Sequence, residues 1–144
     1  MYQLSRIPFV MSLVTLVVLG ACRGGDRAGE ASRTDGVRVT DVTLGRSIGG
    51  DRSVTDRTET FKPNDTIYAS VATDGRAQSV TLRARWTFED GQLVDESSRT
   101  ISPQGQERTE FHISKPDGWP VGRYTVDILL DGASVGTREF EVRN

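Results

Sequence analysis

The chain has 144 residues, a formal net charge of −2 at pH 7 and 35% hydrophobic residues. This length has room for one domain, and so small a charge, with both signs mixed along the chain, argues against nucleic acid as a partner. The single cysteine excludes an intrachain disulfide.

The first residues have the pattern of an export signal. Arg6 supplies a positive charge, and an apolar stretch follows over residues 7–19. A transmembrane helix needs about 20 apolar residues, so this stretch is too short for a stable span and is typical of a secretory signal peptide. The stretch ends in Leu19-Gly20-Ala21-Cys22.

This ending resembles the lipobox of bacterial lipoproteins, in which two small residues precede a cysteine that is acylated before cleavage. The resemblance implies a signal peptide over residues 1–21 and a covalent lipid, such as palmitate, on Cys22. Several acyl chains would then hold the protein on a membrane without threading it through. The alternatives are an ordinary signal cut after Ala21, with Cys22 incidental, and an uncleaved anchor.

Residues 22–36 are expected to be the lipidated cysteine followed by a flexible linker. The stretch after Cys22 has no large apolar residue and cannot offset the entropy of ordering. Lipoproteins with aspartate after the cysteine often stay in the inner membrane. Because Arg23 stands here, the resemblance favours the outer membrane, if the cell has one, within the cell envelope.

From residue 37 to residue 144, apolar and polar residues alternate with a period of two, and turn residues interrupt the pattern every eight to twelve positions. The pattern predicts no helix and seven strands, over residues 37–44, 66–73, 80–88, 92–96, 107–114, 124–130 and 133–142. Asp90-Gly91 and Asp131-Gly132 are predicted hairpin turns. Phase slips indicate irregularities between Val39 and Val42 and a β-bulge near Gly136.

Seven short antiparallel strands with one buried face each are best accommodated by two packed sheets, so we predict an all-β sandwich. The sequence resembles the immunoglobulin-like and fibronectin type III superfamily. Trp86 lies where these domains place a core tryptophan, and Gly122-Arg123-Tyr124 resembles their tyrosine corner. The lack of two bridging cysteines favours fibronectin-like or bacterial variants. This resemblance implies a seven-stranded antiparallel architecture and no particular activity.

Two patterns invite a catalytic interpretation and are better explained without one. Residues 45–49 match the G-x-S-x-G nucleophile elbow around Ser47, but glycine and aspartate follow where the elbow needs a helix. We therefore expect a glycine-rich loop. His112, the only histidine, alternates with Phe111 and Ile113 and should face solvent on its strand. One histidine without a carboxylate cluster makes no zinc site.

Charged residues around the hairpin at residue 90 are a second group to consider. The pairs Glu89-Asp90 and Asp95-Glu96 carry oxygens that calcium prefers, but they lack the dense loop of such sites, so no metal is expected. Arg83 and Arg85 share the outward face of their strand. Cross-strand ion pairs, with Asp127 as a candidate partner, explain them.

Trp119 and Tyr68 are the two candidate contacts to a partner or a glycan. Trp119 follows Asp117-Gly118 and precedes a proline, so it lies in a loop, where it either anchors a ligand or plugs the end of the sandwich. The plug is the favoured interpretation. Tyr68 should face outward between Ile67 and Ala69.

Together these features predict a membrane-anchored, non-enzymatic module for protein–protein interaction in the cell envelope. It would bind another envelope protein through loops or an exposed sheet edge. The alternative is a glycan or cell-wall binding module based on Trp119 and Tyr68. A hydrolase is the third and least favoured hypothesis. No cofactor is expected apart from the lipid on Cys22.

Overall fold

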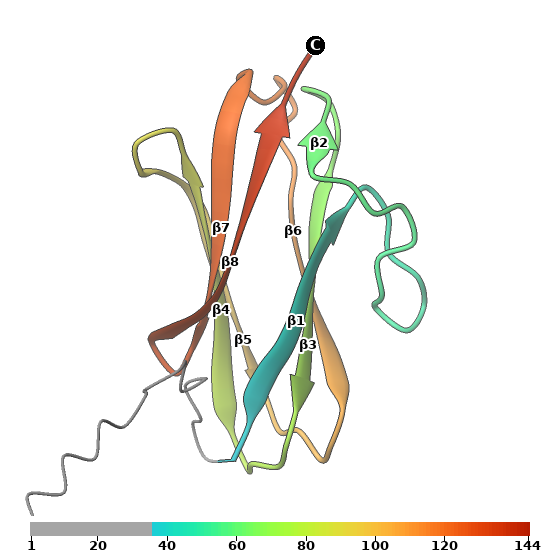
Figure 1. Ribbon diagram of the computed structural model, residues 1–144, viewed down its shortest axis with the longest axis vertical. Helices are drawn as coiled ribbons and strands as arrows, with labels where there is room; N and C mark the ends of the chain where they lie inside the picture. The colour runs from blue at the N-terminus through green and yellow to red at the C-terminus, as the bar shows by residue number, and fades with distance from the viewer. Residues whose placement is uncertain (1–35) are drawn as a thin grey trace, which may run out of the picture.

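The computed structural model describes residues 36–144, which form an all-β immunoglobulin-like sandwich without a helix (Figure 1). The eight strands are β1 (Arg38–Gly45), β2 (Thr60–Phe61), β3 (Ile67–Asp74), β4 (Val80–Phe88), β5 (Gln92–Ile101), β6 (Glu107–Ile113), β7 (Gly122–Leu130) and β8 (Ala133–Val142). Strands β1-β3-β6 form one sheet and β2-β8-β7-β4-β5 the other. None of these described elements is a helix that could span a membrane.

The predictions for the signal peptide, for Cys22 and for most of the linker lie outside the described residues. Within them, the predicted count of seven strands is wrong by one. The additional strand, β2, pairs in parallel with the end of β8, with Phe61 opposite Val142. Two residues cannot show a period of two, and only the distant β8 makes this segment a strand.

Strand β5 also differs from the prediction, because it continues past Glu96 to Ile101. Residues 97–100 are all polar or charged, so they carry no apolar alternation. Their strand conformation comes from the ladder with β4, in which Ile101 lies opposite Val80. Ile101 also packs against the core, which holds this end of the strand in place.

The predicted irregularities are present in the ladders. Register shifts leave Thr40 unpaired in β1 and Val135 unpaired in β8, beside Gly136. The hairpin between β7 and β8 turns at Asp131 and Gly132, whose φ angles of 45° and 86° are both positive. Two positive φ angles characterise the type I′ turn, which matches the twist of paired strands.

The core is formed by the inward-facing side chains of both sheets, and its aromatic centre lies on β4, β7 and β8. The Trp86 side chain is fully buried, and its ring meets the Phe140 ring edge-on, with the centroids 5.9 Å apart. The Tyr124 ring stacks on Phe140, with the centroids 5.2 Å apart. The Tyr124 hydroxyl donates a 2.7 Å hydrogen bond to the Pro120 carbonyl. This bond to backbone upstream is the expected tyrosine corner.

The two long sides of the sandwich differ. On the side of β1 and β8, the Arg138 guanidinium donates a 2.9 Å hydrogen bond to the Val42 carbonyl and lies 3.6 Å from the Asp41 carboxylate. On the opposite side, β5 and β6 are the last strands of their sheets. We call this second side, made by β5, β6 and residues 114–120, the open side.

Candidate functional site

Ser47 lies in the segment between β1 and β2, which stands out from the rest of the molecule in Figure 1. Its hydroxyl is 2.6 Å from the Thr55 hydroxyl, and its neighbour Ile48 forms an isolated β-bridge with Val54. The segment is a loop and leads to no helix, as predicted. It therefore lacks the strand–turn–helix geometry that presents a nucleophilic serine.

His112 faces outward on β6, as the alternation predicted, and half of its side chain is exposed. Its Nδ1 is hydrogen-bonded to the Glu110 carboxylate on the same strand. The Tyr68 ring on the neighbouring β3 lies 5.4 Å from the imidazole, tilted by 43°. Tyr68 is half-buried, so the two rings form a small aromatic pair on the outer face of the three-stranded sheet.

The charged groups around the β4–β5 hairpin form ion pairs. Glu96 on β5 lies 2.8 Å from Arg85 Nε and 3.4 Å from Arg83 Nη1. The hydrogen bond from Arg85 lowers the pKa of Glu96 below its ordinary value. Among the residues described, no three histidine, cysteine or acidic side chains gather in a way that could hold a metal ion.

Asp127, the candidate partner of the two arginines, forms no ion pair with them. It does lie opposite Arg85 in the ladder between β4 and β7. Its carboxylate instead accepts hydrogen bonds from the hydroxyls of Ser134, at 2.5 Å, and Thr137, at 3.1 Å. The ion-pair partner is Glu96, which lies opposite Arg85 on β5, the strand on the other side of β4.

Trp119 plugs one end of the sandwich, and only 7% of its surface is exposed. Its indole Nε1 donates a hydrogen bond of 3.1 Å to the Asp65 carbonyl, and its backbone N–H donates one of 2.7 Å to the Pro63 carbonyl. The ring meets Tyr124 edge-on at 6.3 Å. Trp119 belongs to the core, whereas Tyr68 lies on an outer face, so the structure does not bring these two candidates together.

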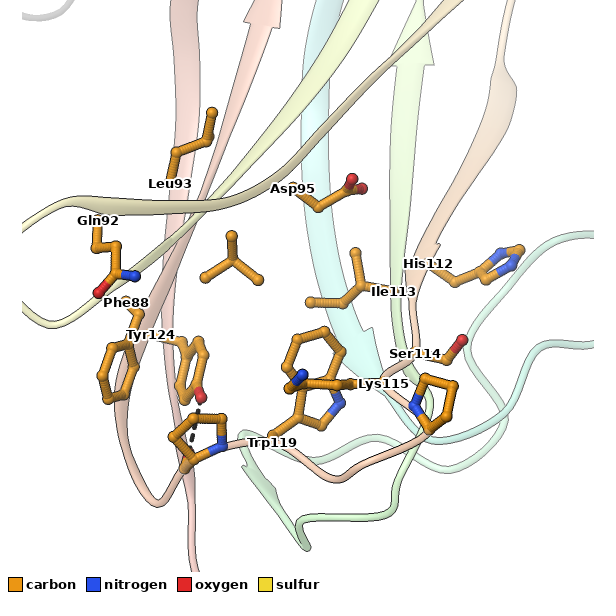
Figure 2. Close-up of a pocket in the computed structure, with 13 residues that line it drawn as sticks. Phe88, Gln92, Leu93, Asp95, His112, Ile113, Ser114, Lys115, Trp119 and Tyr124 are labelled. Carbon is orange, nitrogen blue, oxygen red and sulfur yellow. Dashed lines mark hydrogen bonds between the residues drawn. The ribbon is translucent and has the colours of Figure 1, made fainter.

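A hollow of about 540 Å³ lies at one end of the open side. Figure 2 shows Leu93 and Asp95 on β5 at one flank, Ile113 of β6 at the other, and Trp119 and Tyr124 at the base. Leu93 is 57% exposed, which makes it one of two large hydrophobic side chains exposed among the described residues. The hollow thus combines apolar surface with the polar edges of two strands.

Sequence reasoning did not single out this hollow. Its lining comes from β4, β5, β6 and the segment before β7, which lie side by side only in the folded chain. Leu93 is a weak signal in the sequence, because it is apolar and lies close to a hairpin turn, on a strand whose other apolar residues are Val94 and Ile101. A single exposed leucine is too common to be informative alone.

Comparison with known proteins finds structures with a similar fold and no match by sequence. No family model matches this sequence, and no curated protein matches it. The C-terminal domain of Wzt is similar in structure, with a TM-score of 0.52, 13% identity, and coverage of 77% of this chain and 75% of that one. An immunoglobulin-like protein from Pseudomonas aeruginosa has a TM-score of 0.48 at 14% identity, over 80% of this chain and 100% of that one.

A third similar structure is the alkylpurine DNA glycosylase AlkC of Pseudomonas fluorescens, bound to DNA with an abasic site analogue. It has a TM-score of 0.50 at 18% identity and covers 76% of this chain. This chain spans only about a third of the glycosylase, 31% of its length. At such identities the likeness concerns the fold alone.

Proposed function

We propose that this chain is a lipid-anchored module of a bacterial cell envelope that binds another envelope protein through the open side of its sandwich, without catalysing a reaction. The observation that carries the proposal is the hollow of about 540 Å³ between two strand edges, with Leu93 57% exposed beside it. Exposed apolar surface next to unpaired strands is typical of protein-binding sites.

The expected partner segment is an extended polypeptide. Its apolar side chains would contact Ile113 in the hollow and Leu93 at its rim, and its backbone would form hydrogen bonds with the edge of β6. Asp95 and Lys115, which also line the hollow, would fix its orientation through charge. A glycan is less well supported, because sugar rings stack on open aromatic faces and Trp119 is 7% exposed.

Anchoring through Cys22 gives this site its location. The linker of residues 23–36, when extended, spans about 45–50 Å, so the domain would reach partners well above the lipid surface. A module of this kind works by position and contact. It requires no cofactor, and its partners are the membrane, through the lipid, and an envelope protein.

Crosslinking in cells tests the proposed site. A photo-crosslinking amino acid placed at Leu93 should yield an adduct with a specific envelope protein, whereas the same group at Glu139, an exposed position on β8, should not. Leu93→Asp should reduce recovery of that partner at least tenfold, because it places a charge on an apolar contact. Val121→Asp is the matched control, since Val121 is 52% exposed outside the strands.

The same cells test the anchor. An alkyne-tagged fatty acid should label the wild-type chain and should not label Cys22→Ser, which should also lose its partner in pull-downs. Equal adducts from positions 93 and 139, or none from either, would contradict the proposed site. Recovery of cell-wall fragments in place of a protein would favour the glycan alternative.

A further inference from the structure

The four edges of the two sheets are not equally available to another strand. Strand β1 is covered by Arg138 and, at its end, by the bridge between Gly45 and Arg57. Strand β2 has only two residues, and on β6 the Arg108 carbonyl accepts a hydrogen bond from Arg52. Strand β5 has ten residues and ends the five-stranded sheet, so it is the longest free edge in the described part of the chain.

In the middle of β5 the inward-facing side chains are polar, whereas Val94 and Ile101, nearer its ends, pack against the core. Across the ladder, Asp95, Ser97 and Arg99 lie opposite Trp86, Ala84 and Leu82, which are fully buried. Asp95 and Arg99 are exposed, and the described residues include no ion-pair partner for either. The Arg99 guanidinium lies over the Phe111 ring of β6, 5.9 Å from its centroid, and so contacts an aromatic face and not a carboxylate.

Inward-pointing charges on an edge strand normally prevent pairing, because a neutral strand laid alongside would cover them without compensation. The extra residue at Val94 in the ladder with β4 adds to this protection at one end of β5. A strand with opposite charges at the matching positions is the exception. Such devices therefore select a partner strand by its sequence.

Strand β5 itself has the matching sequence. When two copies pair antiparallel about a two-fold axis perpendicular to the sheet, one residue must lie opposite its own copy, because facing residues share one side of the sheet. Centring on Asp95, Glu96 or Arg99 places like charges opposite each other, which is destabilising. Centring on Ser98 places Asp95 opposite an isoleucine.

Only centring on Ser97 brings opposite charges together. Asp95 of each copy then lies opposite Arg99 of the other, and Glu96 lies opposite Ser98. We propose that β5 pairs with β5 of a second copy of this chain in this register. The five-stranded sheets of the two copies would form one continuous sheet, stabilised by two symmetric Asp95–Arg99 ion pairs.

This interface goes beyond the proposed function and is compatible with it. The backbone edge of β5 points away from β4, whereas the hollow lies between the two sheets. A two-fold axis perpendicular to the shared sheet leaves both three-stranded sheets on the same side of it. The two hollows of the dimer therefore open towards a common groove.

Cysteine crosslinking in membranes from cells that express the full chain tests the register. Oxidation of Ser97→Cys should give a disulfide-linked dimer at least ten times faster than oxidation of Ser98→Cys, because directly opposite Cβ atoms are about 4.5–5.5 Å apart and diagonal ones about 7–8 Å. The wild-type chain is the control for Cys22. Faster crosslinking of Ser98→Cys, or equal rates for both, would overturn the proposed register.

Charge exchange tests the ion pairs on the purified full-length chain in detergent. Asp95→Arg and Arg99→Asp should each weaken dimerisation about tenfold or more, since each places like charges opposite one another at two symmetric positions. The double variant, Asp95→Arg with Arg99→Asp, should restore the wild-type dissociation constant, measured by analytical ultracentrifugation. If the single variants weakened dimerisation only by destabilising the fold, the double variant would not restore it.

Two results would overturn the inference. One is a wild-type chain that stays monomeric in detergent at 100 times the concentration at which it crosslinks in membranes. The other is single variants that dimerise like the wild type. Neither result bears on the proposed function, because the adduct from Leu93 identifies an envelope protein by its own mass. Loss of the Leu93 adduct with an intact dimer would contradict the proposed function and leave the inferred dimer standing.

Discussion

Tyr124 shows how one side chain ties a loop to the core. Its ring lies between Phe88, at 4.7 Å, and Phe140, at 5.2 Å, while its hydroxyl bonds the Pro120 carbonyl. Burial is the larger cause that raises the pKa of the Tyr124 phenol above its ordinary value, and repulsion from the Glu89 carboxylate raises it further. The hydroxyl therefore stays protonated as a donor throughout the neutral range, and Pro120 keeps its partner next to the proposed binding hollow.

Tyr124→Phe removes this hydroxyl and leaves the ring packing in place. We expect the free energy of unfolding to fall by about 1 kcal/mol, with the Pro120 carbonyl losing its donor. Tyr68→Phe, on the half-buried outer face, is the matched control and should change it by less than about 0.5 kcal/mol. Urea unfolding followed by tryptophan fluorescence measures both. Equal effects would show that the corner bond does not contribute to stability.

At the scale of elements, the segment between β1 and β2 is held by close backbone contact as well as by side chains. Arg46 bridges this segment, with its guanidinium bonded to Asp56 at 3.2 Å, to Asp65 at 3.0 Å and to the Thr60 carbonyl at 2.9 Å. Gly45, just before it, packs so closely that an added Cβ would collide with the Val54 side chain and the Asp56 carbonyl. The loop therefore requires glycine at the end of β1.

Gly45→Ala should lower the free energy of unfolding by about 1–3 kcal/mol, because the methyl group must displace backbone of the neighbouring loop. Gly50→Ala, in the same loop, is the matched control. An added Cβ there meets no atom within 4 Å, so its effect should be close to zero. Chemical denaturation of both variants checks the difference, and a neutral Gly45→Ala would mean that the loop can move away from β1 at little cost.

For the molecule as a whole, the difference between the two sides of the sandwich is decisive. The side of β1 and β8 is bridged by the hydrogen bond from Arg138 to the Val42 carbonyl, whereas on the other side β5 and β6 each end their sheet. The hollow lies at one end of this open side, and Asp95 and Arg99 on β5 are exposed. The contacts of Arg138 between the sheets therefore lie on one side and the hollow on the other.

Acid titration should reveal the charge interactions of Asp41 on the side of β1 and β8. The hydrogen bond from Thr43 is the largest influence on Asp41 and lowers its pKa, with smaller contributions from the Val42 backbone, Arg138 and Arg57, against an opposing effect of burial. A carboxylate with a lowered pKa in the folded state stabilises the fold above its unfolded pKa, and this stabilisation is lost as the pH falls through the folded pKa.

Wild-type protein should therefore be more stable than Asp41→Asn at pH 7, and the difference should shrink as the pH falls below about 4. Urea unfolding of both proteins from pH 7 to pH 2 measures it. A difference that stays constant over this range would show that the charge of Asp41 does not contribute, and that only the shape of its side chain does.

The alternation of residues and the Asp-Gly turns were sufficient to predict most strands. The prediction for β4 and β8 matches their observed bounds, and the irregularities in β1 and β8 were visible as phase slips. These are local properties, because a strand with one buried face needs a period of two wherever it lies. The signal and lipidation motif at residues 1–22 is also local and stays a prediction.

Tertiary structure decided the rest, because it depends on residues far apart in the chain. Thr60–Phe61 is a strand only because β8 lies beside it, and residues 97–100 are strand only because β4 does. Trp119 is core, and not an exposed loop tryptophan, because Asp65 and Pro63 reach it from 54 or more residues upstream. The open side follows from which strands end the two sheets and lie next to each other, which no local pattern encodes.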